Sequence, residues 1–216
     1  MRLTGGTRSP SQAIHRAAGL RTVEILDSRF VREICFVHIG KTGGTSVWRY
    51  MQQTAAVARG EVSLIKRRHS TAAQIASDVG KKRWGEALTF SIVRNPFDRF
   101  RSACRQDHAN PNDPKVWASI EAGTAFEDKV AKHPRHIFVT QKTSLFIDGH
   151  LGVDIVFNFE NGFEPLVALL WTRGLIAQFG HYNNKHQKPV KLSREACQFV
   201  RDVYSDDFKA FGYDKR

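Results

Sequence analysis

Short apolar runs alternate with longer amphipathic segments along this chain of 216 residues. The runs at 34–39, 88–93 and 154–158 have the length and the apolar, partly β-branched content of buried strands. The amphipathic segments predict helices at 45–57, 71–79, 97–106, 116–131, 163–173 and 193–204. Short strands that alternate with helices are typical of a parallel sheet covered by helices. The pattern therefore predicts an α/β fold in a single domain.

Composition agrees with such a domain and indicates the charge of its partner. Apolar residues make up 41% of the chain, which is enough to bury a core. A formal net charge of +12 predicts an acidic partner, such as a cofactor with several negative charges or a sulfated or carboxylated glycan. Nucleic acid is the rival partner. We do not expect it, because the basic residues are spread along the chain without an RRM, KH or zinc-finger pattern.

Residues 36–51 combine a buried strand, a glycine-rich turn and the start of a helix. The glycines permit a tight turn, and the Thr-Ser pair that follows can begin a helix. A helix N-terminus offers unpaired N–H groups and about half a positive charge, so an anion binds there readily. The residues expected to contact a phosphoryl or sulfuryl group are Lys41, Thr42, Gly43, Gly44, Thr45 and Ser46.

This turn differs from the Walker A loop of NTPases. Gly40, Lys41 and Thr42 match the end of that motif, but the position of its first glycine is Cys35, inside the predicted strand. The long loop that wraps a nucleotide's β-phosphate is therefore missing, and an NTPase is disfavoured.

A second motif follows the strand at 88–93. Arg94 ends the strand, and Pro96 suits the first turn of a helix that also contains Ser102. Arg94 offers a planar fork suited to phosphate, and Ser102 offers a short neutral donor, although their spacing alone does not bring them together. We expect Arg99 and Arg101 to be solvated charges on the helix surface.

With both motifs in this order, the chain resembles the carbohydrate-type sulfotransferases, a family that includes the heparan sulfate 2-O-sulfotransferases and many bacterial relatives. The resemblance covers roughly residues 31–214. Further segments similar to the bacterial members are Gln141, 151–154, 159–161, Asn183, Asn184, Lys185 and 204–213. One departure is Gly40, where the family usually has proline. The turn is therefore expected to be less pre-organised without losing a donor.

The resemblance implies the sulfotransferase fold, a P-loop-like parallel sheet flanked by helices, over residues 31–216. Residues 1–30 are expected to be a loosely ordered N-terminal extension. It also implies 3′-phosphoadenosine 5′-phosphosulfate (PAPS) as sulfuryl donor, 3′-phosphoadenosine 5′-phosphate (PAP) as product, and no required metal. The expected acceptor is a hydroxyl group of a carbohydrate. Its identity is expected to depend on the loops between 105 and 150.

The resemblance also assigns roles to single residues. The loop after the first strand is the 5′-phosphosulfate loop, and Arg94 and Ser102 hold the 3′-phosphate. Lys41 neutralises the bridging oxygen as the sulfuryl group departs. His69, in the His-x-Thr-Ala pattern of bacterial members, takes the proton of the acceptor hydroxyl, a role that suits an imidazole with an ordinary pKa near 6.5. His38, beside the loop, is the alternative base.

Several basic and acidic residues keep more than one interpretation. Glu160 either orders the site, meets the acceptor or pairs with a neighbouring base. The basic stretch 181–194 either clamps an anion or is a solvated loop, and 66–68 has the same two interpretations with acceptor binding preferred. The polar loop 110–114 either borders the acceptor site or is an ordinary surface turn.

The cysteines and the apolar runs predict the compartment. Cys35, Cys104 and Cys197 form no Cys-x-x-Cys pair, so neither a zinc site nor a disulfide framework is expected. No apolar run approaches the roughly 18 residues of a membrane span. Golgi relatives begin with a membrane anchor, so we expect a soluble, cytoplasmic enzyme of bacterial type.

Three functional hypotheses follow. A sulfotransferase predicts binding of PAP without metal. A P-loop phosphotransferase or kinase predicts dependence on ATP and Mg²⁺. A non-enzymatic basic module predicts salt-sensitive binding to any polyanion. The two motifs favour the sulfotransferase.

Overall fold

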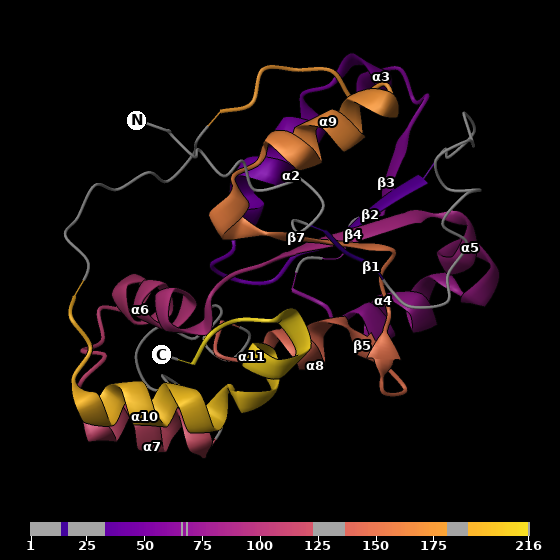
Figure 1. Ribbon diagram of the computed structural model, residues 1–216. Coiled ribbons are helices and arrows are strands. Elements are labelled where there is room, and N and C mark those ends of the chain that lie inside the picture. The colour runs from indigo at the N-terminus through magenta and orange to yellow at the C-terminus, as the bar shows by residue number, and fades with distance from the viewer. Residues whose placement is uncertain are drawn as a thin grey trace, which may run out of the picture.

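The computed structural model describes residues 14–16, 33–65, 67, 69–122, 137–180 and 190–215. Its centre is a five-stranded sheet in the order β1-β7-β4-β2-β3 (Figure 1). The strands are β1 (Ile14–Arg16), β2 (Glu33–Val37), β3 (Ser63–Ile65), β4 (Leu88–Val93) and β7 (Ile155–Asn158). Strands β3, β2, β4 and β7 run parallel, and β1 pairs with β7 antiparallel at one edge. The predicted parallel sheet is confirmed.

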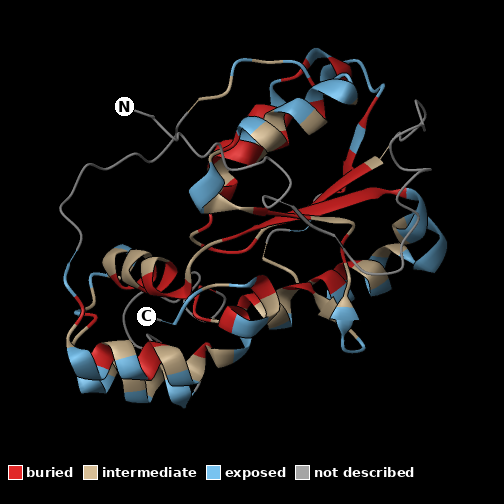
Figure 2. Cartoon of the chain, in the orientation of Figure 1, coloured by how far each residue is buried: buried red, intermediate tan, exposed pale blue. Residues whose placement is uncertain are grey.

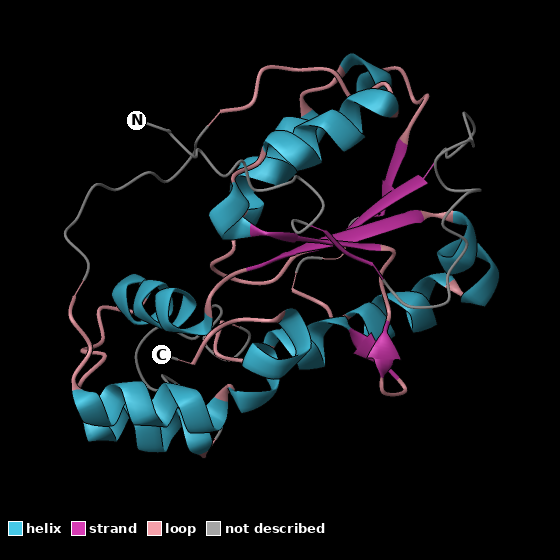
Figure 3. Cartoon of the chain, viewed as in Figure 1, coloured by secondary structure: helices cyan, strands magenta, loops and turns pink. Residues whose placement is uncertain are grey.

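Helices cover both faces of this sheet (Figure 3). Over one face lie α2 (Gly44–Gln52), α3 (Ala55–Ala58) and α9 (Glu164–Thr172). Over the other lie α4 (Ala72–Val79), α5 (Lys81–Glu86) and α8 (Gln141–Leu145). This arrangement confirms the α/β class predicted from the alternating pattern.

A second group of helices packs beside the sheet around its own apolar cluster. Its members are α6 (Pro96–Gln106), α7 (Pro114–Glu121), α10 (Arg194–Val203) and α11 (Ser205–Phe211). Shorter elements are the hairpin of β5 (Phe146–Ile147) and β6 (His150–Leu151) and the 3₁₀ turn η2 (Phe159–Asn161). Helix α6 begins where β4 ends, so this group borders the carboxyl end of the sheet.

Strand β4 is buried along its whole length, as expected for a central parallel strand (Figure 2). Leu88, Phe90 and Ile92 pack toward α2 and α9. The alternate positions carry smaller residues, among them Ser91, whose hydroxyl donates a 2.8 Å hydrogen bond to the carbonyl of Val37. Thr89, on the same face, donates its hydroxyl to Oδ2 of Asp154, the residue before β7, at 2.7 Å.

Most predicted elements are present with small differences in their ends. The strand at 88–93 is confirmed at both ends, whereas the predicted helix 45–57 is divided into α2 and α3. The division occurs at Thr54, which has an extended backbone with ψ of 142° and donates its hydroxyl to the carbonyl of Met51. The predicted stretch 116–131 is helical to Glu121, and 123–136 lies outside the described residues.

Two further expectations concern the N-terminal segment and membranes. Strand β1 lies within the predicted extension 1–30, and the rest of that extension is outside the described residues. Within the described ranges, every helix is too short or too polar to cross a bilayer.

Candidate functional site

The two predicted motifs meet at the carboxyl ends of the neighbouring strands β2 and β4. Residues 38–43 link β2 to α2, and residues 94–95 link β4 to α6. A direct hydrogen bond joins the two turns, since Nη1 of Arg94 donates to the carbonyl oxygen of Lys41 at 3.2 Å. Ligands of open α/β sheets bind at this end of the strands, so the arrangement suits a binding site.

The turn after β2 has an unusual backbone. Lys41 and Gly43 both adopt left-handed conformations, with φ of 72° and 81°, and Gly43 is the N-cap of α2. Thr42 is buried and donates its hydroxyl to the carbonyl of Ile39 at 2.9 Å, which stabilises the turn from inside. In the first turn of α2, Thr45 is half-buried, Ser46 is buried, and no acidic residue is present. The start of this helix therefore has the charge that an anion requires.

Gly44, the first residue of α2, has no room for a side chain because the imidazole of His38 occupies the adjacent space. A Cβ atom at this position would overlap the ring of His38. His38 also stacks on Phe36, with ring centroids 5.6 Å apart. The ring is thereby held directly against the start of α2.

Both predicted bases lie together at this site. The rings of His38 and His69 have centroids 5.0 Å apart and are tilted by 35°. His69 has φ of 60° and precedes α4, whose N-cap is Thr71. Thr71 forms a capping box with Gln74, which fixes the start of α4 two residues after His69. The structure brings the two imidazoles together without choosing between them.

Arg94 is a half-buried cation with spare hydrogen-bonding capacity. Its guanidinium lies over the ring of Phe159, 4.4 Å from the centroid. Burial lowers the pKa of Arg94, and the charges of Asp98 and Glu160 oppose that effect from beyond ion-pair distance. Its Nε atom is buried and has no hydrogen-bond partner among the described residues. Arg94 can therefore donate to an anion.

Ser102 lies in the second turn of α6 and is half-buried. The charges of Asp98 and Arg105 both act on the Arg94 guanidinium. Ser102 is four residues after Asp98 and three before Arg105, so all three share one helix face. The helix is fixed at its start by Asn95, whose side-chain oxygen accepts from the N–H of Phe97 at 3.0 Å.

The C-terminal end of α6 adds a carboxyl group that sequence reasoning missed. Lys41 donates through Nζ to Oε1 of Gln106 at 2.7 Å. The next residue, Asp107, has a buried Oδ2 that hydrogen-bonds to nothing in the described parts of the chain. Burial raises the pKa of Asp107, and the charges of Lys41 and His108 oppose this. Its only sequence signal was its place directly after the predicted helix 97–106.

The prediction that Arg99 is a solvated surface charge was wrong. Its side chain is 2% exposed, and Nε donates to the carbonyl of Gly40 at 3.1 Å. Its Nη2 donates to the carbonyls of Ile137 and Val139 at 2.9 and 2.8 Å. Arg101 is half-buried and pairs with Asp98 at 2.6 Å. Arg99 is thus covered, whereas the pair of Arg101 and Asp98 stays partly exposed to water.

Arg99 also anchors the turn at Gly40, which was expected from the sequence to be less pre-organised than with proline. The carbonyl of Gly40 is held by Arg99, and a Cβ atom at this position would lie 2.9 Å from Cγ2 of Ile137. The close approach of Ile137 favours glycine here. Glycine at this position is therefore compatible with an anchored turn.

Glu160 has an ordering role. Its Oε1 accepts from the N–H of Asn95 at 2.6 Å, and its Oε2 accepts from the hydroxyl of Tyr213 at 3.0 Å. Of the three interpretations, ordering of the turn after Arg94 is the one with observed contacts.

Other candidate residues contribute less. Arg67 is exposed and pairs with Asp78 at 3.2 Å. Lys66, Arg68 and 181–189, which include Asn183, Asn184 and Lys185, lie outside the described residues. In the polar loop, Asn112 accepts from the N–H of Ser193 at 2.8 Å and so ties the loop to the start of α10.

Comparisons with protein families, with curated proteins and with solved structures give no match to this chain.

Proposed function

We propose that this protein is a sulfotransferase that moves a sulfuryl group from PAPS to a hydroxyl group of an acceptor, with carbohydrate as the expected acceptor class. The observation that carries the proposal is the contact between the two turns at Arg94 and Lys41. Each turn offers donors to an anion, and the two lie at neighbouring strand ends. A nucleotide with separate anionic groups at its 5′ and 3′ positions requires two such places, whereas the phosphates of ATP form a single chain.

The residues present fit this cofactor, and the fold proposed for them is the sulfotransferase fold. Arg94 and Ser102 would hold the 3′-phosphate, because the buried Nε of Arg94 has no partner among the described residues and Ser102 lies in the second turn of α6, the helix that begins two residues after Arg94. The start of α2 would hold the 5′-phosphosulfate, because it has no acidic residue in its first turn. The set that would contact it is Lys41, Thr42, Gly43, Gly44, Thr45 and Ser46.

The chemistry requires a base and a cation in the same place. When bound, the cofactor supplies the sulfuryl group. His69 accepts the proton of the acceptor hydroxyl while the new O–S bond forms and the S–O bond to the 5′-phosphate breaks. Lys41 neutralises the charge that develops on the departing oxygen. His38, whose ring centroid is 5.0 Å from that of His69, is the alternative base.

Calorimetric titration with PAP and with ATP, both in EDTA, tests the proposal. Wild-type protein is expected to bind PAP selectively without metal, and the double variant Arg94→Ala with Ser102→Ala is expected to lose that binding. The control is Arg83→Ala, which removes an exposed cation that pairs with Glu33 at the start of β2, at the opposite end of the sheet.

Two results would contradict the proposal. Preference for ATP with Mg²⁺ would favour the phosphotransferase. Unselective binding of polyanions that weakens steeply with salt would favour the basic binding module.

A further inference from the structure

A buried glutamine holds the backbone of Arg94 on both sides. The side-chain Oε1 of Gln141 accepts from the N–H of Arg94 at 2.8 Å, and its Nε2 donates to the carbonyl of Arg94 at 2.9 Å. Gln141 is 0% exposed. Its amide therefore pairs with Arg94 as a neighbouring strand would, one residue beyond the end of β4.

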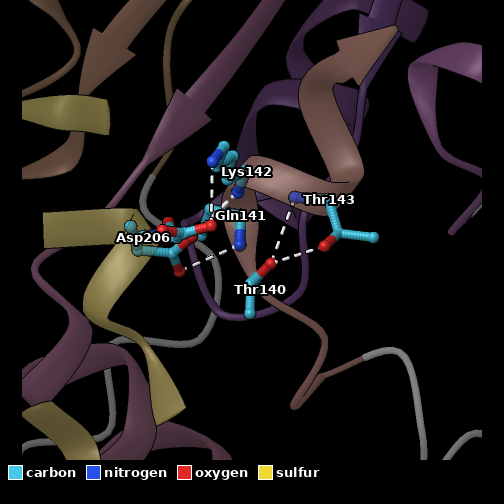
Figure 4. A network of polar contacts seen from close by, with 6 residues as sticks. Thr140, Gln141, Lys142, Thr143 and Asp206 are labelled. Atoms are coloured by element: carbon cyan, nitrogen blue, oxygen red, sulfur yellow. Dashed lines mark hydrogen bonds and ion pairs between the residues drawn. The ribbon is translucent and has the colours of Figure 1, made fainter. Parts of the chain in front are cut away.

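Gln141 is itself fixed by the carboxylate of Asp207 on α11. Oδ2 of Asp207 accepts from the N–H of Gln141 at 2.9 Å, and Oδ1 accepts from the N–H of Lys142 at 2.8 Å. Figure 4 shows this start of α8, where Thr140 also accepts from the N–H of Thr143 at 3.1 Å and Lys142 pairs with Asp206 at 2.8 Å. Asp207 is 0% exposed, so both side chains that lead from α11 to the half-buried Arg94 are fully buried.

Packing alone does not require this polar connection. Buried polar groups cost free energy unless they are hydrogen-bonded, and an apolar side chain would fill the same volume without that cost. A buried network in which every polar group is hydrogen-bonded holds its members in one geometry. Here the residue held is Arg94, whose buried Nε has no partner within the described residues. The connection ends at Arg94, where precise direction matters for a bidentate donor.

We infer that Gln141, held by Asp207, is a positioning residue for Arg94 and thereby sets the affinity for the 3′-phosphate of the nucleotide. This inference rests on the proposed function. It assigns to the helix α11, which lies outside both anion-binding turns, a part in cofactor binding.

A double-mutant cycle tests the inference through PAP affinity. Gln141→Met is expected to raise the dissociation constant about tenfold, the scale of one well-placed hydrogen bond to a charged group. In the Arg94→Ala background the same change is expected to have no further effect, because the residue that Gln141 positions is gone. Asp207→Asn is a second variant, with an expected effect in the same direction.

The control is Thr54→Val, which removes another buried hydrogen bond, from the Thr54 hydroxyl to the carbonyl of Met51, at the α2–α3 junction. This variant is expected to lose stability and keep wild-type affinity for PAP. Hydrogen exchange of the Arg94 amide gives a readout without nucleotide, and it is expected to be faster in Gln141→Met than in wild type or Thr54→Val.

The outcomes separate the two claims. Failure of wild-type protein to bind PAP would overturn the proposed function. Wild-type binding together with unchanged affinity of Gln141→Met, or an equal loss in the Arg94→Ala background, would overturn the positioning role alone.

Discussion

The two ends of the central sheet use arginine in different ways. At the amino end, where β2 and β3 begin, Arg83 pairs with Glu33 at 2.6 Å and Arg59 pairs with Glu61 at 2.5 Å. At the carboxyl end, Arg94 is more buried than either of these and forms no ion pair within the described residues. Glu160, one of the two carboxylates whose charge acts on Arg94, instead accepts from the backbone N–H of Asn95.

This difference shows how a binding site is distinguished from ordinary surface charge. In an exposed ion pair the two charges neutralise each other, and the pair contributes little to the stability of the fold. Arg99 is more buried still, but carbonyl oxygens accept from its guanidinium, whereas the buried Nε of Arg94 has no acceptor within the described residues. Arg94 therefore differs from these other arginines because one of its buried donors is left for an anion.

The largest effect is expected from the loss of Lys41, the cation at the carboxyl end of the sheet that is proposed to act during sulfuryl transfer. Lys41→Ala should lower turnover by about 10²–10³-fold while changing PAP affinity much less, because Lys41 acts on charge that develops during transfer. Release of PAP from PAPS in the presence of a carbohydrate acceptor measures turnover. Full turnover in this variant would remove Lys41 from the mechanism.

The next effect sharpens the comparison by changing only the shape of a cation. Arg94→Lys keeps the charge but loses the planar fork, so PAP affinity should fall by about 1.5–3 kcal/mol. Arg83→Lys at the amino end is the matched change and should leave affinity unaltered. Calorimetry on both variants checks the expectation, and equal affinities would show that charge alone suffices at the carboxyl end.

Backbone crowding offers a third comparison between the two ends. Gly44→Ala would overlap His38 and should cost about 1–3 kcal/mol of the free energy of unfolding. Gly85→Ala in α5 meets nothing within 4 Å and should instead add about 0.5–1 kcal/mol. Urea unfolding measures both changes. Equal signs for the two variants would show that the contact with His38 is not tight.

The smallest effect is expected at the amino end and depends on pH. Arg83 lowers the pKa of Glu33 below its ordinary value of 4.5, mainly through their hydrogen bond. The stabilisation is therefore present above about pH 4.5 and is lost as pH falls through the lower, folded-state pKa. Glu33→Gln should slightly reduce stability at neutral pH and make no difference in stronger acid. An equal deficit at both pH values would show that the pair is not electrostatic.

Sequence patterns identified the elements whose signal is local. The apolar run that forms β4 is followed by Pro96, so its end was placed correctly. Strand β3 was missed because three residues, Ser63–Ile65, are too few to show a period. Helix α11 was not predicted, because the last expected helix ended at Tyr204. In the structure Tyr204 has ψ of 22° and separates α10 from α11.

The environment of the site could be predicted only in part, because much of it comes from distant segments. Arg99 resembles a surface arginine until residues 137–139 cover it and accept its hydrogen bonds. The contact of Gln141 with Arg94 spans 47 residues, and that of Asp207 with Gln141 spans 66. No window of sequence contains such pairs, so a charge pattern cannot reveal them.

These separations also bear on the order in which the protein is made. A ribosome releases β2, β4 and the turn at Arg94 well before it synthesises α11, and chains generally begin to fold from the N-terminal side. Until Asp207 emerges, the contact that fixes Gln141 cannot form. A nascent chain can therefore form β2 and β4 before the connection from Asp207 through Gln141 to Arg94 is complete.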